Sequence, residues 1–303
     1  MLLERTIPVE YIAASAWKDF LVVVAISVAG ALLVEYERPY LPELPVTIAA
    51  FLGTAISLIL SFKLNQTYDR WWEARKVWGA IVNDSRTLVR QSLSFASVAA
   101  QDDPKVAALV RRMAMHQVAW CYCLGQSLRG LDWRANTVDH LDVDEIAELE
   151  RHSNRPVALL QLQSRSLTEL AASGAVTDYQ RVAIDQTLTR LTDWMGMAER
   201  IRNTVFPRTY RMFLKAFIYV FITVLSISLG EVEGYWEILV TTIISTPFLL
   251  LERTSTQMQD PFSNLPTDTP VTAIARTVEI NILQLLGESD VPPPYPADSF
   301  YLM

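Results

Sequence analysis

The feature that most constrains this chain is the stretch Val46–Phe62, seventeen residues long and without a formal charge. At about 1.5 Å per residue, a helix of this length reaches roughly 26 Å, close to the hydrocarbon thickness of a bilayer. The sequence then runs without a proline into residues 63–79, a segment rich in charge and tryptophan. Charged side chains are costly in lipid, and tryptophan favours the membrane–water interface. The pattern therefore predicts one helix that begins in hydrocarbon and ends in water.

Three further apolar runs predict three more spans. Phe20–Val34 and Ala216–Gly230 carry no charge, and Tyr235–Leu251 has a single acid near its start. The proline-rich turn 35–45 joins the first run to Val46–Phe62, so the first two spans are expected to form a hairpin. Mean hydropathy is only +0.20, which makes membrane segments a minority of the chain.

The region between the second and third spans, about 85–211, is predicted to be all-helical. Apolar residues recur at three- and four-residue spacing in 87–98, 105–128, 143–150, 156–173 and 178–203. No run alternates with a period of two for long enough to indicate a sheet. After the fourth span we expect a further amphipathic helix over 270–286 and a tail rich in proline and acid.

Basic residues set the expected orientation. They crowd 63–76 and 200–215, whereas the short loops 35–43 and 231–233 are net acidic. The positive-inside rule then places both termini and the helical middle in the cytoplasm. The expected order is an N-terminal arm (1–15), a transmembrane hairpin (16–62), a cytoplasmic helical domain (63–211), the third and fourth spans (212–251), and a C-terminal cytoplasmic helix and tail (252–303).

Charge and motifs exclude several functions. A net charge of −7 argues against a nucleic-acid partner, which would need a basic face. Cys121 and Cys123 point about 200° apart on a helix and are interpreted as reduced, buried thiols. The common nucleotide-binding and hydrolase motifs are missing, so neither an enzyme nor a cofactor is expected.

Metal sites also have weak support. His116 lies in a helical segment beside Met113 and Trp120, which favours a packed core residue over a ligand. The acids between Asp139 and Glu150 lack the glycine and the terminal glutamate of a calcium loop, so a solvated helix start is the preferred interpretation. Asp260 with Asp268 is a second, weaker candidate, and we predict no metal site.

The segment after the second span carries the most specific pattern. It combines aromatic, cationic and anionic side chains at helical spacing: Asn65, Tyr68, Asp69, Arg70, Trp71, Trp72, Glu73, Arg75, Trp78 and Gly79. An interfacial anchor and a rigid joint between membrane and cytoplasm both fit these residues. The segment resembles the signature of the bestrophin family of ion channels. Asp260, Pro261 and Phe262, after the fourth span, resemble a second motif of that family, and the length of the chain is similar to that of the bacterial members.

The resemblance implies a homopentamer in the bacterial inner membrane, with five second spans around one axial pore. Counting back from the signature, the apolar neck of the family matches Phe62, Leu58 and Thr54, of which Thr54 departs from the bulky apolar type. Tyr179 matches the cytoplasmic aperture by a loose alignment. Residues 263–268 supply a single acid, unlike the calcium clasp of animal members. A ring of bulky apolar side chains dewets a narrow pore, so the neck is expected to act as a hydrophobic gate.

The expected function is therefore passive conduction of small monovalent ions. Acidic outer loops and the negative net charge slightly favour cations such as sodium over chloride. An anion channel of the same fold is the first alternative, and a membrane-anchored helical scaffold or sensor without conduction is the second. The expected partners are the other subunits, membrane lipid and the permeant ions.

Overall fold

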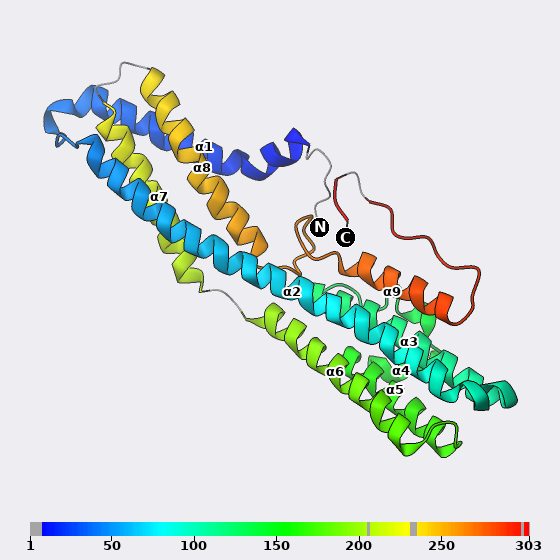
Figure 1. The fold of residues 1–303 in the computed structure, drawn as a ribbon. Helices are drawn as coiled ribbons and strands as arrows, with labels where there is room; N and C mark the ends of the chain where they lie inside the picture. The colour runs from blue at the N-terminus through cyan, green and yellow to red at the C-terminus, as the bar shows by residue number, and fades with distance from the viewer. Residues whose placement is uncertain (1–7, 205–206, 231–234, 298–299, 303) are drawn as a thin grey trace. The chain divides into compact units, whose positions relative to one another are not determined.

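The computed structural model describes residues 8–204, 207–230, 235–297 and 300–302, and every regular element among them is a helix (Figure 1). The elements are, in order, α1 (Val9–Glu37), η1 (Arg38–Tyr40), α2 (Val46–Asp102), α3 (Pro104–Arg129), η2 (Val138–His140), α4 (Val143–Glu150), α5 (Arg155–Ala172), α6 (Asp178–Asn203), α7 (Arg208–Ser228), α8 (Tyr235–Met258) and α9 (Val271–Leu285). The predicted all-helical class is confirmed.

Four of these helices are long and apolar enough to cross a membrane. The candidate spans are Ala16–Glu37 of α1, Val46–Ala96 of α2, Thr209–Ser228 of α7 and Tyr235–Met258 of α8. They contain three of the four apolar runs from which spans were predicted, and all of the run Ala216–Gly230 except its last two residues. The acidic residues 231–233, expected to form an outer loop, lie outside the described residues.

The helices form two compact units. The first, here called the membrane unit, contains residues 4–71 and 205–260, and the second, the helical unit, contains 1–3, 72–204 and 261–303. Helix α2 contributes residues to both units. Helix α9 belongs to the same unit as the helices of 72–204, although it follows the fourth apolar run in the sequence. The expected division into five consecutive segments stays a prediction.

Two helices extend beyond their predicted ends. Helix α1 begins at Val9, so residues 9–15 of the expected arm are helical; Pro8 immediately precedes the helix, where a missing N–H costs nothing. Residues 1–7 of the arm lie outside the described residues. Helix α2 is 57 residues long and includes 87–98, a segment expected to belong to the helical region after the second span. It continues because no proline or glycine interrupts residues 80–102.

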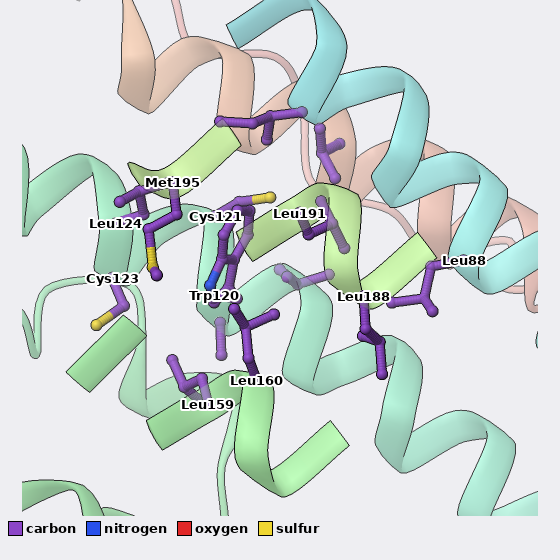
Figure 2. Packing of buried hydrophobic residues seen from close by; sticks show 14 of the residues in the cluster. Leu88, Trp120, Cys121, Cys123, Leu124, Leu159, Leu160, Leu188, Leu191 and Met195 are labelled. Atoms are coloured by element: carbon purple, nitrogen blue, oxygen red, sulfur yellow. The ribbon is translucent and has the colours of Figure 1, made fainter. Parts of the chain in front are cut away.

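The core of the helical unit lies between α2, α3, α5 and α6. Figure 2 shows buried side chains from all four helices around Trp120 of α3, among them Leu88, Leu159 and Leu188. Cys121 and Cys123 are free and buried within this core, and burial raises the pKa of each thiol to about 12. Both thiols are buried, as predicted, and thiols held so far from ionisation are poor nucleophiles.

Candidate functional site

The first half of α2 carries an exposed apolar stripe. Leu58 and Phe62 are each 60% exposed, and Thr54 is exposed as well. Ile56 and Leu60, on the other side of the helix, are buried in the core of the membrane unit. The three predicted neck residues therefore lie on a side of α2 that the rest of the membrane unit leaves uncovered.

Phe51, which is 73% exposed, extends this stripe and was missed by counting in steps of four. At 100° per residue, Phe51 lies about 20° from the line of Leu58, whereas Thr54 lies about 40° away. The hydroxyl of Thr54 donates to the carbonyl oxygen of Ala50 at 2.8 Å, so its polar atom is satisfied within the helix. A bulky aromatic residue at seven-residue spacing was the sequence signal for this position.

Small residues recur on α2 every three or four positions, at Gly53, Thr54, Ser57 and Ser61, a stripe that suits either close helix packing or the wall of a pore. A Cβ atom on Gly53 would lie 3.1 Å from the ring of Phe221 on α7, so Gly53 permits close packing of the two helices. Ser57 and Ser61 are exposed instead, and the Ser57 hydroxyl donates to the Gly53 carbonyl oxygen at 2.8 Å. The two readings of this stripe, packing contact and uncovered wall, therefore apply to different residues.

A buried charge cluster lies one residue beyond Phe62. Lys63 Nζ is 3.0 Å from Glu252 Oε1, and both side chains are almost completely buried. Thr256 adds a hydroxyl 3.1 Å from Lys63 Nζ, and Lys215 Nζ lies 3.6 Å from the second oxygen of Glu252. We call these four residues the Glu252 cluster. Lys63 belongs to the basic run 63–76 that set the expected orientation, and its pairing was not predicted; the acid that directly follows the fourth apolar run was the available signal for a buried partner.

The signature segment is divided among several environments. Asn65, Tyr68, Asp69 and Trp72 are exposed; Arg70, Trp71, Glu73, Arg75 and Gly79 are partly covered; and Trp78 is fully buried. Arg70 Nη2 lies 3.7 Å from Asp260 Oδ1, so the structure brings the two sequence motifs together. Pro261 and Phe262, which follow Asp260, are buried. Trp78 is therefore a core residue of the helical unit, and the interfacial-anchor interpretation does not apply to it.

Tyr179 lies in the first turn of α6 and is 84% exposed. The start of α6 is fixed by a capping box, in which the Thr177 hydroxyl accepts from Gln180 N at 3.3 Å and Thr177 N donates to Gln180 Oε1 at 2.9 Å. Tyr179 belongs to the helical unit, whereas the neck residues belong to the membrane unit.

His116 is a buried core residue, as predicted, but it has a charged partner. Its Nε2 atom lies 2.8 Å from Glu145 Oε1, and Arg112 Nε lies 3.1 Å from the same oxygen. Burial alone would raise the pKa of Glu145, but the interactions with His116 and Arg112 lower it overall. The interpretation of the acidic cluster as a solvated helix start is therefore wrong for Glu145, although Asp139 and Asp144 are exposed. In the described part of the chain no three His, Cys, Asp or Glu side chains converge on a metal-sized site.

Known proteins with similar sequences and structures identify the family. The family of bacterial and fungal bestrophin proteins matches residues 8–284. The chain is 29% identical over 256 residues to the voltage-dependent anion channel-forming protein mll4386 of Mesorhizobium japonicum, which covers 84% of this chain and 80% of the relative. It is 27% identical over 257 residues to the voltage-dependent anion channel-forming protein YneE of Escherichia coli, which covers 84% and 82%.

The solved structures agree with the sequence matches. The crystal structure of a bacterial bestrophin homolog from Klebsiella pneumoniae superimposes with a TM-score of 0.81 at 28% identity, covering 89% of this chain and 98% of that chain. The family match, the relatives and the shared structure all extend over most of the sequence. This chain therefore belongs to the bacterial and fungal bestrophin family.

Proposed function

We propose that this protein is a passive channel for small monovalent ions, with a pore lined by the exposed stripe of α2. The observation that supports this function best is the pairing of two faces on one span: Leu58 and Phe62 are uncovered, while Ile56 and Leu60 are buried. Uncovered side chains at one-turn spacing suit a symmetric assembly, in which copies of one helix surround an axis. The relatives named as channel-forming proteins support the same conclusion.

The proposed assembly is a homopentamer in the inner membrane with both termini in the cytoplasm. Five copies of Leu58 and of Phe62 would form two apolar rings one helical turn apart. Such rings exclude water when the passage is narrow and admit ions when it widens, which makes them a hydrophobic gate. The basic residues that follow Phe62, from Lys63 to Lys76, support a cytoplasmic position for this end of the span.

The proposed channel could prefer either cations or anions. The neck residues carry no charge, so selectivity is set by charges outside the neck. The acidic loops and the net charge of −7 favour cations, whereas the names of the relatives favour anions. We retain a channel that prefers cations such as sodium as the first candidate and an anion channel of the same fold as the second.

The deciding experiment is the reversal potential of the purified protein in a planar bilayer under a salt gradient. A shift towards the cation equilibrium potential supports the first candidate, and a shift of opposite sign supports the second. Protein-free bilayers are the control. If the protein passes no current at all, the proposed channel function is contradicted, and the membrane-anchored scaffold remains as the alternative.

Oligomeric state provides an independent check. Chemical crosslinking in mild detergent is expected to give a ladder of five bands. A monomer under the same conditions would be incompatible with an axial pore.

A further inference from the structure

The Glu252 cluster joins three helices of the membrane unit through one carboxylate. Lys63 of α2 and Lys215 of α7 lie 3.0 and 3.6 Å from its two oxygens, and Thr256 of α8 donates to Glu252 Oε1 at 3.0 Å. Lys63 is 0% exposed, while Lys215 is 37% exposed and reaches solvent. The only fully enclosed cation of the cluster is therefore the one on α2.

The position of Lys63 relates this cluster to the proposed gate. Phe62 and Lys63 are consecutive, so their side chains leave α2 about 100° apart. Holding Lys63 against Glu252 therefore fixes the direction in which Phe62 points. Leu58, one turn before Phe62, is exposed like Phe62, and Leu60, about 200° from each of them, is buried.

Apolar packing alone determines this direction only weakly. Around the cluster, α2 contacts α7 through aliphatic and aromatic side chains such as Leu60, Ile218 and Phe221. In a bilayer, lipid tails solvate such side chains almost as well as a neighbouring helix does, so a rotation of α2 costs little from these contacts. A rotation that separates Lys63 from Glu252 leaves the enclosed Lys63 charge unpaired in a medium of low dielectric constant, while Glu252 keeps only the more exposed Lys215. This loss is far more costly than the loss of apolar contacts.

We infer that Glu252 is a positioning residue for the gate: through Lys63 it sets the rotation of α2 and hence the direction of Leu58 and Phe62. The inference rests on the proposed channel function for its biological meaning, but the rotation itself is measurable without any current. A purely stabilising role for the ion pair would leave the direction of the α2 side chains unchanged.

The test compares Glu252→Gln with a matched control that removes the ion-pair partner of Arg253, the adjacent residue of the same helix. Arg253 Nη1 lies 2.9 Å from Asp19 Oδ2, so Asp19→Asn also removes an interhelical ion pair of α8. That pair joins α8 to α1 and does not involve α2. Both variants are made in the full-length chain and reconstituted in liposomes.

The readout is the reaction of single cysteines with a membrane-impermeant thiol reagent. Leu58→Cys and Phe62→Cys report the exposed side of α2, and Leu60→Cys reports the buried side; the natural cysteines are buried and are monitored in the parent protein. In Glu252→Gln the ratio of the labelling rates at positions 62 and 60 should fall by about tenfold, whereas Asp19→Asn should leave it unchanged. An unchanged ratio in Glu252→Gln would overturn the inference.

A double variant separates positioning from stability. Lys63→Met with Glu252→Leu removes both enclosed charges, so the melting temperature should return close to that of the parent protein. The labelling ratio should stay low, because no charged pair then specifies the rotation of α2. Recovery of the ratio together with the melting temperature would show that the pair only stabilises the fold. If the parent protein passes no current but the labelling ratios change as expected, the proposed channel function is contradicted, while the role of Glu252 in setting the rotation of α2 is supported.

Discussion

Asp84 of α2 accepts two hydrogen bonds from the guanidinium group of Arg190 on α6, with N–O distances of 3.0 and 2.9 Å. Its other oxygen accepts a hydrogen bond from the indole N–H of Trp194 at 2.8 Å. The Asp84 side chain is 14% exposed, so this carboxylate is mostly removed from water. These contacts fasten α6, the helix that carries Tyr179, to the second half of α2.

We expect Asp84→Ala to destabilise the helical unit by roughly 1–3 kcal/mol, because two N–H groups of the partly exposed Arg190 and the indole N–H of Trp194 lose their acceptor. The melting temperature in detergent and the hydrogen exchange of α6 measure the effect. The matched control is Glu73→Ala, which removes the more exposed pair of Glu73 with Arg200 and should cost less than about 1 kcal/mol. Equal effects of the two substitutions would show that Asp84 has no special role.

Local signals explain which parts of the fold the sequence predicted well. Helices α4 and α6 have the expected bounds, 143–150 and 178–203, because each begins at a capping box and shows clear apolar periodicity. The neck positions Thr54, Leu58 and Phe62 were matched through the family resemblance. That they share one exposed side of α2 follows from 3.6 residues per turn.

The contacts that the sequence did not predict join distant residues. Asp84 and Arg190 are 106 positions apart, and Lys63 and Glu252 are 189 apart. Each partner by itself is an ordinary charge on a helix, and only tertiary packing selects the pairing. The pairing of His116 was not predicted for the same reason: its partner Glu145 lies on a different helix, α4.

Phe62→Ala and Leu58→Ala are each expected to raise single-channel conductance by about twofold or more, because a smaller side chain widens and wets an apolar ring. Bilayer recordings of purified variants measure the change. Phe217→Ala is the matched control, because Phe217 is similarly exposed but lies on α7. Conductance that is unchanged in both neck variants would remove these residues from the gate.

Phe51 and Thr54 are alternative residues for the outermost ring of the proposed neck. Phe51 is bulkier and lies nearer the line of Leu58 and Phe62, so Phe51→Ala should raise conductance more than Thr54→Ala. The same recordings decide between them. A larger effect of Thr54→Ala would favour the position implied by the family resemblance.

Asp268 is expected to make the stability of the helical unit depend on pH. Burial raises the pKa of its carboxyl from 3.8 to about 6, against the opposing hydrogen bond from Leu265 N and the charge of Arg129. A raised pKa in the folded state means that the stabilisation is complete below pH 4 and is lost as the pH rises through about 6. The free energy of unfolding that is lost over this pH range is about 3 kcal/mol.

Asp268→Asn keeps an oxygen that can accept the hydrogen bond from Leu265 but removes the titration. The melting temperature should therefore depend on pH differently in the parent protein and in the variant when both are measured between pH 4 and pH 7.5. The parent protein should lose relative stability as the pH rises. Parallel curves would mean that Asp268 ionises in the folded and unfolded states with the same pKa.

Gly30 of α1 is expected to tolerate no side chain, because a Cβ atom there would lie 2.2 Å from Ser226 Oγ and 2.7 Å from Ser226 Cβ on α7. Gly30→Ala should therefore destabilise the membrane unit by about 1–3 kcal/mol, the usual cost of overpacking, and lower the melting temperature in detergent. Gly196→Ala on α6 is the control; its added Cβ meets nothing within 4 Å, so the change should be neutral or stabilising. Adding Ser226→Gly to Gly30→Ala restores the missing space and should recover part of the loss. Failure of the double variant to recover any stability would show that the contact between these two residues is not the cause.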